Sequence, residues 1–289
     1  MTIQVEILQF LHYNPSSSRV EISAGLTEAP NERTLKRIIA ELVQNGDVIV
    51  EGKGKATRYS LSAQAHLMMP LNIDTYFIKD IDERKVQESF NFQLIQDVLP
   101  RVTLFTPEEK IRLESAHKEF LANMETLSDL EYRKEMERLG VDLSWKSSQI
   151  EGNTYSLLET ERLLKEKQTA QGKTKEEAVM LLNHKDALDF ILDNPDYLKE
   201  LSVRRLEDIH SILTKELGVG NGIRKRRVGI TGTNYRPLDN EFQIREALED
   251  TCQLINGKEN VFEKALLILV LLSYIQAFTD GNKRTARIS

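Results

Sequence analysis

The sequence predicts a mainly α-helical protein with a small amount of β-structure. From Thr106 to the end of the chain, apolar residues recur in most segments at the spacing of amphipathic helices. Two stretches of the whole chain instead have the pattern of short hairpins. Residues 47–62 alternate in polarity, and residues 224–239 are rich in β-branched residues and glycine. With 289 residues, 40% of them hydrophobic, the chain has room for two domains with a sizeable core.

The first predicted domain covers residues 1–62. Helical spacing marks the stretches "IQVEILQFLHY" and "NERTLKRIIAELVQ", with a short helix expected between them, and Asn31 is a good N-cap for the last. The stretch "DVIVEGKGKATRYSLS" then alternates as two strands around a Gly-Lys-Gly turn. Three helices followed by a hairpin is the order of a winged helix-turn-helix, which this segment resembles.

The sequence leaves two kinds of binding partner possible for this first domain, DNA and protein. DNA contacts would come from basic residues of the third helix and the hairpin, namely Arg33, Lys36, Arg37, Lys53 and Lys55. Residues 1–62 hold seven Lys and Arg against seven Asp and Glu, however, whereas dedicated DNA-binding domains are usually basic. Docking onto a protein, or dimerisation, is therefore the alternative.

The remainder is predicted to be a linker and N-terminal extension, residues 63–105, followed by a helical domain, residues 106–289. Thr106 followed by proline, and Ser156 followed by Glu159 in a capping box, mark two helix starts. The longest apolar stretch, residues 265–275, is too short to cross a bilayer and predicts a buried helix, so no membrane association is expected. One cysteine and no visible secretory signal are typical of a cytoplasmic protein.

The closing stretch "IQAFTDGNKRTAR" carries the chemistry. Asp280 can cap a new helix that begins near Asn282, and Gly281 lets the backbone bend between the two helices. Free N–H groups together with Lys283, Arg284 and Arg287 would make an anion site suited to a di- or triphosphate. The acid Asp280 fits beside a phosphate if a divalent cation lies between them. From the residues alone, a plain helix–helix corner is the alternative.

This stretch resembles the signature of the Fic (Fido) family, His-Pro-Phe-x-Asp/Glu-Gly-Asn-Gly/Lys-Arg with a further Arg three residues on. Two other stretches also resemble family motifs, in the family's order. "LSWKSSQIEGN" is similar to the inhibitory-helix motif, which places an inhibitory helix near residues 144–152. "GNGIRKRRVGITGTNYRP" is similar to the segment with the substrate-positioning flap. The matching positions are Phe278, Asp280, Gly281, Asn282, Lys283, Arg284 and Arg287 in the signature, Ser147, Glu151 and Gly152 in the inhibitory motif, and Gly232, Thr233 and Tyr235 in the flap.

The resemblance implies a helical Fic domain that binds ATP with Mg²⁺ and transfers AMP to a hydroxyl of a target protein. Asp280 would hold the metal, and the backbone and side chain of Gly281-Asn282 would hold the α-phosphate region. Phe278 and Lys283 would also belong to the nucleotide site. Arg284 and Arg287 would hold the outer phosphates. Glu151 would pair with Arg287 and keep the site inhibited. The target protein is not readable from the sequence, which also leaves room for a homodimer.

Gln276 stands where the family signature has its histidine. An amide does not titrate near neutral pH, so it cannot act as the general base, and the expected loss is about 10²–10⁴-fold. His184 and His210 lie on amphipathic helices and are interpreted as structural. The sequence thus predicts a catalytically weak adenylyltransferase-type protein. The alternatives are a non-catalytic nucleotide-sensing or DNA-binding regulator, and altered chemistry such as AMP removal.

Overall fold

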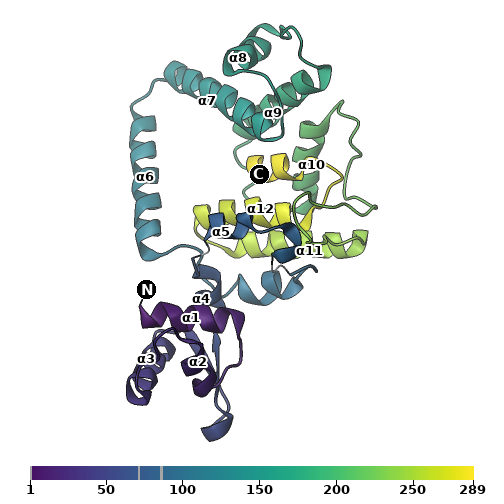
Figure 1. The fold of residues 1–289 in the computed structure, drawn as a ribbon. Helices are drawn as coiled ribbons and strands as arrows, with labels where there is room; N and C mark the ends of the chain where they lie inside the picture. The colour runs from purple at the N-terminus through teal and green to yellow at the C-terminus, as the bar shows by residue number, and fades with distance from the viewer. Residues whose placement is uncertain (1, 71, 85–86) are drawn as a thin grey trace. The chain divides into compact units, whose positions relative to one another are not determined.

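The structure is a computed structural model, and it describes residues 2–70, 72–84 and 87–289. Most of these residues are helical, and the described part of the chain contains one sheet, of two antiparallel strands (Figure 1). The predicted mainly helical fold class is therefore confirmed. The chain divides into two compact units, residues 1–79 with 101–104, and residues 80–100 with 105–289.

The first unit has the expected order of three helices and a hairpin. In the hairpin, Val48 lies opposite Leu61 and Glu51 lies opposite Arg58. The elements of this unit are α1 (Ile3–Tyr13), α2 (Arg19–Gly25), α3 (Glu32–Gln44), β1 (Val48–Glu51), the short turn η1 (Gly54–Ala56), β2 (Arg58–Leu61), α4 (Ala63–Met68) and α5 (Ile73–Ile78).

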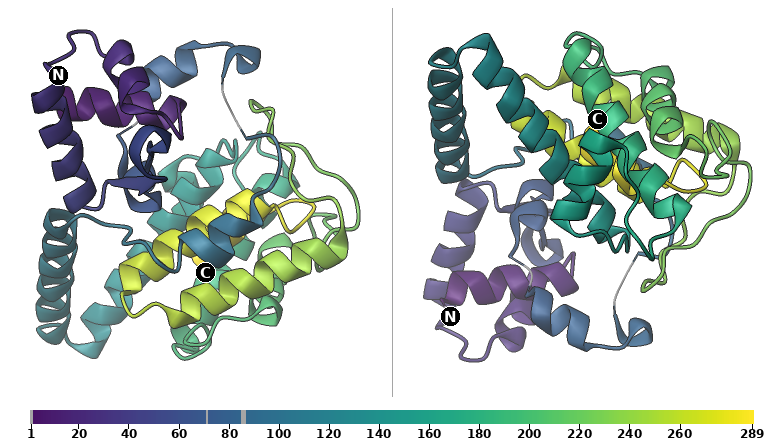
Figure 2. Two further views of the ribbon diagram at one scale, coloured as in Figure 1. Left: turned by 90° about the horizontal axis from the view of Figure 1, so that it is seen from below. Right: turned by 90° about the horizontal axis from the view of Figure 1, so that it is seen from above.

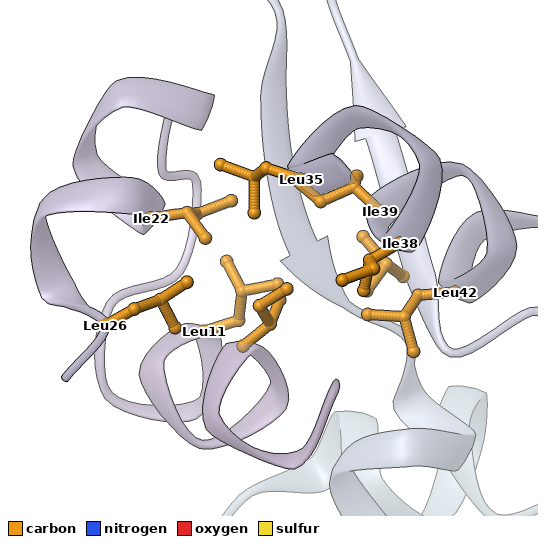
Figure 3. Packing of buried hydrophobic residues seen from close by; sticks show 9 residues of the cluster. Leu11, Ile22, Leu26, Leu35, Ile38, Ile39 and Leu42 are labelled. Atoms are coloured by element: carbon orange, nitrogen blue, oxygen red, sulfur yellow. The ribbon is translucent and has the colours of Figure 1, made fainter. Parts of the chain in front are cut away.

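The core of the first unit follows from the apolar face of α3. The side chain of Asn31 accepts a hydrogen bond from the Thr34 backbone N–H at 2.9 Å, which confirms the predicted N-cap and sets the start of the helix. The buried face of α3 then meets side chains of α1, α2 and β1 (Figure 3). The cluster consists of Ile7, Leu11, Ile22, Leu26, Leu35, Ile38, Ile39, Leu42 and Val48.

The second unit is helical, and its long helices begin where the sequence predicts. Thr106 and Ser156 each form a capping box, with Glu109 and Glu159 respectively. The elements are η2 (Ile81–Glu83), η3 (Leu94–Val98), α6 (Pro107–Glu125), α7 (Asp129–Ile150), α8 (Leu157–Glu166), α9 (Lys175–Asp193), α10 (Val203–Thr214), α11 (Glu241–Gly257), α12 (Val261–Ile275) and α13 (Asn282–Ile288).

Two helices organise the packing of this unit. α12 packs against α11 and α13, while α9 packs against α7 and α10 (Figure 2). The apolar stretch of residues 265–275 lies within α12 and buries Leu267, Leu271 and Ile275, which confirms the predicted buried helix. No helix in the described part of the chain is both long and apolar enough to span a membrane. The ends of α7 and α13 also lie together, because Arg287 of α13 bonds to Ser147 and Glu151.

The expected hairpin at residues 224–239 is wrong. The described residues of this segment form a loop with no ladder between its two arms. The buried Arg224 side chain takes the place of a ladder, because its guanidinium donates to the carbonyls of Arg226 (2.8 Å), Leu238 and Gln276 (Nε to O, 2.6 Å). One side chain thus closes the base of the loop and ties it to the end of α12.

Candidate functional site

The predicted site is built on the turn that joins α12 to α13. Gln276 ends α12 in the left-handed conformation, with φ of 53°, which is uncommon for a residue other than glycine. Its side-chain Nε2 donates to the carbonyl of Ser273 at 2.7 Å, and its Oε1 accepts from Asn282 Nδ2 at 3.2 Å. The amide is therefore held between the last turn of α12 and the first residue of α13.

Asn282 fixes the shape of the turn. The side chain is buried, its Oδ1 accepts the Phe278 backbone N–H at 2.8 Å, and its Nδ2 donates to the Phe278 carbonyl at 2.8 Å. These bonds satisfy a backbone N–H and a carbonyl that would otherwise be buried without partners. Asn282 thus holds residues 278–282 in one conformation.

The helix cap of α13 differs from the prediction. Gly281, with φ of 78°, occupies the N-cap position, and the Asp280 carboxylate instead accepts the Gly281 N–H at 2.6 Å. A side chain at 281 would be strained by that φ and would place its Cβ 3.0 Å from Thr214. Glycine is needed here because the turn passes close to α10, and this leaves Asp280 free to face outward.

His210 of α10 lies against the turn. Its ring stacks on Phe278 with centroids 3.9 Å apart, and its Nε2 lies 2.9 Å from the Asp280 carbonyl, to which it must donate. The residue is fully buried, and burial lowers the pKa of the imidazole. A neutral ring that gives its one proton to a backbone carbonyl supports the turn, in agreement with the structural interpretation.

Arg284 is a buried cation with unused donors. The residue is 3% exposed, and its Nη2 donates to Asp280 Oδ2 at 3.2 Å. Its Nη1 is buried without a partner among the described residues. A buried guanidinium with an unsatisfied donor is costly unless an anion or water completes it. Asp280 is only a partial counterion, because its side chain is 67% exposed.

Arg287 is bound by the end of α7. Its Nη2 donates to Glu151 Oε1 at 2.6 Å, which confirms the predicted pairing of these two residues. Ser147, one turn earlier, accepts from Arg287 through both its hydroxyl (3.0 Å) and its carbonyl (3.1 Å). Gly152 follows with φ of 91°, a conformation that ends the helix and leaves Glu151 as its C-cap.

A buried polar cluster lies next to the two arginines. His184 of α9 makes a 3.2 Å contact with the hydroxyl of Ser144, and neither its Nε2 nor the Ser148 hydroxyl has a partner in the described part of the chain. Burial, with Arg287 and Arg284 nearby, lowers the pKa of His184 to about 4. The imidazole is therefore neutral at pH 7 and adds no positive charge to the site.

A polar pocket opens over the turn. It encloses about 270 Å³ and is lined by the turn, by Glu151 and by one arm of the loop, namely Val228, Gly229, Ile230, Thr231, Gln276, Thr279, Asp280, Gly281, Asn282 and Lys283. Larger hollows of about 510 Å³ lie along α7 and α9 and beside α11. Neither of them borders the turn, so the smaller pocket is the better candidate site.

The predicted flap residues lie further along the loop. Gly232, Thr233 and Tyr235 are not among the pocket-lining residues. Tyr235 stacks on Tyr274 of α12 at 4.8 Å and donates to its carbonyl at 2.9 Å, so it anchors the loop to the helix. The role of Arg224 was not predicted, because it depends on three carbonyls that only the folded chain brings together.

A metal at this site would depend on Asp280. The described residues contain no group of three or more His, Cys, Asp or Glu side chains able to hold an ion. Mg²⁺ bound with a nucleotide commonly uses only one or two carboxylates, with phosphates and water completing its shell. The exposed carboxylate of Asp280, at the mouth of a pocket beside Arg284, fits that arrangement.

The five basic residues of the first unit that are predicted to contact DNA are all exposed. On α3, Lys36 lies 3.7 Å from Glu32, and Arg37 pairs with Glu41. Glu32 and Glu41 therefore offset part of the positive charge with which Lys36 and Arg37 would bind DNA phosphates. Contact with DNA through Arg33, Lys36, Arg37, Lys53 and Lys55 stays a prediction.

Part of the chain that contains the site is similar to known proteins. Residues 200–289 match the Fic/DOC family, a range that includes the loop, the turn and both arginines. The chain is 29% identical over 147 residues to protein adenylyltransferase fic-1 of Caenorhabditis elegans, which covers 48% of this chain and 28% of that protein. The chain therefore spans less than a third of the length of this relative.

Solved structures share the fold. Fic-1 (amino acids 134–508) from C. elegans aligns with a TM-score of 0.54 at 18% identity, covering 99% of this chain and 82% of that one. A variant of the same fragment gives 0.53 at 22% identity over 62% of this chain and 55% of that one. A Fic family protein from Desulfovibrio desulfuricans G20 gives 0.51 at 18% identity, covering 64% and 56%.

Proposed function

We propose, from the premise that residues 200–289 form a domain of the Fic/DOC family, that this chain binds ATP and is an adenylyltransferase-type protein. The relative named protein adenylyltransferase supports ATP as the nucleotide. The observation that carries the proposal is that Nη1 of the buried Arg284, which follows the pocket-lining turn, has no hydrogen-bond partner in the part of the chain that the structure describes. A phosphate would supply the missing acceptor.

Each residue of the turn has a part in this proposal. Arg284 and Arg287 would bind the outer phosphates, and Lys283, which lines the pocket, would add a further positive charge. Asp280 would hold a divalent cation against the phosphates, and that cation would neutralise charge during transfer. Asn282 would act by holding the turn in shape, because its side chain is already bonded to Phe278 and Gln276.

Glu151 is proposed to inhibit the site. Arg287 has one guanidinium, and its Nη2 and Nε are taken by Glu151 and Ser147 of α7. A phosphate could recruit Arg287 only by displacing the Glu151 carboxylate, and the two negative groups would repel each other in the same place. The ion pair thus supports a state in which a triphosphate is bound poorly.

Transfer itself is proposed to be slow. A target hydroxyl would form a bond to the α-phosphorus while the bond to pyrophosphate breaks, and the hydroxyl proton must leave. Gln276 has no basic lone pair for it, and both ends of its amide are occupied by the turn. His210 cannot substitute, because it is buried and gives its Nε2 proton to the Asp280 carbonyl.

The second candidate function is a nucleotide-sensing regulator without transfer chemistry. The observation that favours it is the same engagement of the Gln276 amide, which makes this residue part of the turn rather than a free reactive group. In that case the first unit would supply the output, by binding DNA or a protein. A cytoplasmic location is a further proposal, and the one cysteine, the buried Cys252, is consistent with it. A homodimer is also proposed.

The test is incorporation of labelled AMP into the protein itself and into a cell lysate. Four proteins are compared: the parent, Glu151→Gly, Gln276→His, and the double variant. We expect no measurable transfer by the parent, little by either single variant, and a rise of about 10²-fold or more in the double variant over Glu151→Gly. Circular dichroism checks that all four are folded.

The outcomes separate the two candidate functions. Rapid transfer by Glu151→Gly with Gln276 still present would mean that another base exists, and the role given to Gln276 would be wrong. Absence of transfer by the folded double variant, combined with tight ATP binding, would favour the nucleotide sensor. Absence of both would overturn the proposed ATP site.

A further inference from the structure

Three helices of the second unit meet at a buried polar cluster. His184 lies on α9, Ser144 and Ser148 lie one turn apart on α7, and Arg284 lies on α13. α9 packs against both α7 and α13. Each of these four residues is at most 3% exposed. Their polar atoms therefore need partners within the protein or from an ordered water.

Three atoms of this cluster have complementary chemistry. The His184 Nε2, the Ser148 hydroxyl and the Arg284 Nη1 are buried, and each lacks a hydrogen-bond partner among the residues that the structure describes. A neutral imidazole nitrogen can accept, a guanidinium can only donate, and a hydroxyl can do both. A buried water typically makes about three hydrogen bonds to groups of this kind. One water therefore suffices for all three atoms.

The surroundings of His184 make its Nε2 a suitable acceptor. Its Nδ1 lies 3.2 Å from the Ser144 hydroxyl, so Nε2 is the ring nitrogen that remains for a second contact. Burial lowers the pKa of the imidazole to about 4, and the charges of Arg287 and Arg284 add to that shift. The ring is therefore neutral at pH 7 and has one lone pair to offer. Because a guanidinium has no acceptor, this lone pair fits Arg284 when it lies on Nε2.

Arg284 needs an anchor on its buried side. Its Nη2 donates to Asp280 Oδ2 at 3.2 Å, but the Asp280 side chain is 67% exposed. A divalent cation held by Asp280 would compete for the same carboxylate. A bond mediated by water is nearly as favourable in enthalpy as a direct one. Such a bond from the side of α9 would hold the guanidinium whether or not Asp280 is engaged.

We propose that His184 is a positioning residue for Arg284, whose Nη1 donates to His184 Nε2 through a buried water that the Ser148 hydroxyl also binds. In this arrangement Nδ1 carries the imidazole proton and donates it to Ser144. Nη1 has two N–H groups, so one remains for a phosphate. The inference rests on the proposed function, because the bond would aim Arg284 at the outer phosphates of ATP.

The test uses two variants that keep different halves of the imidazole. His184→Asn keeps an amide near the place of Nδ1, whereas His184→Gln puts an amide oxygen near the place of Nε2. Each variant enters a double-mutant cycle with Arg284→Met, measured by urea unfolding without nucleotide. We expect His184→Asn to show a coupling with Arg284 of about tenfold in the unfolding equilibrium constant, and His184→Gln a coupling below about twofold.

A second measurement reads the aim of Arg284. ATP and AMP are titrated with Mg²⁺ into the Glu151→Gln protein with and without each His184 variant. We expect His184→Asn to weaken ATP binding about tenfold and to leave AMP binding unchanged, while His184→Gln changes neither. A merely structural role predicts the opposite order, because the contact with Ser144 survives in His184→Asn and is lost in His184→Gln.

Several results would overturn the proposal. They are equal coupling for the two variants, no coupling for either, and ATP binding that is equal in both variants or weaker in His184→Gln. A failure of the proposed function looks different. If the Glu151→Gln protein binds no ATP while His184→Asn alone shows the coupling, the ATP site is wrong and the bond between His184 and Arg284 stands.

Discussion

The ion pair between Glu151 and Arg287 should stabilise the fold measurably. Its atoms lie 2.6 Å apart, and the two side chains are 26% and 21% exposed. Fully exposed pairs contribute about 0.2–1 kcal/mol, and hydrogen bonds to charged groups about 1.5–3 kcal/mol. A pair that is mostly shielded but still touches water should fall between these ranges, so we expect a coupling energy of about 1–2 kcal/mol.

A double-mutant cycle measures this coupling. Glu151→Gln and Arg287→Gln remove the charges singly and together, and the loss of the Arg287 bonds to Ser147 occurs in both arms of the cycle and cancels. Unfolding in urea is followed by the fluorescence of Trp145, the single tryptophan, which lies on α7 and donates to the Tyr155 carbonyl at 2.9 Å. A coupling energy within about 0.3 kcal/mol of zero would refute the pairing in solution, and with it the proposed inhibition.

Three further predictions concern the buried His184, the buried Asn282 and two lysines of the first unit. The pKa of His184 is about 4 in the fold and 6.5 ordinarily, so the unfolded chain takes up the proton first as pH falls. The free energy of unfolding should therefore drop between pH 6.5 and 4, by up to about 1.4 kcal/mol per pH unit from this group. In an acid titration of His184→Asn, this contribution to the pH dependence of stability should be absent. Asn282→Ala should lower the free energy of unfolding in urea by about 2–3 kcal/mol, because its bonds to Phe278 are lost; a loss under about 0.5 kcal/mol would contradict its role in the turn. If the first unit binds DNA, Lys36→Ala and Lys53→Ala should each reduce the salt dependence by about one unit of slope, whereas absence of salt-dependent affinity in the full chain would favour protein docking.

Local features were predictable from the sequence. Asn31, Thr106 and Ser156 cap helices because the bonds that they accept come from residues three positions further on. The pairing of Glu151 with Arg287, far apart in the chain, was also predictable, but only through the resemblance of two separate motifs to one family. No local rule joins those residues.

Features that depend on tertiary packing were not predictable. Asp280 looked like a helix cap, but the close approach of Thr214 requires glycine at the cap position. The residues of the 224–239 loop have strand propensity, yet Arg224 binds the carbonyls that close the loop, so no ladder forms. These outcomes depend on contacts between segments that pattern and propensity do not encode.

The central claim is that Glu151 keeps Arg287 from the outer phosphates of ATP. Calorimetric titration of ATP and AMP with Mg²⁺, into the parent, Glu151→Gln and the control Glu137→Gln on the exposed side of α7, tests it most directly. We expect Glu151→Gln to bind ATP about tenfold more tightly than the parent and the control, while AMP, which lacks the outer phosphates, binds all three equally. Equal ATP affinity in all three proteins, or an equal gain for AMP, would contradict it.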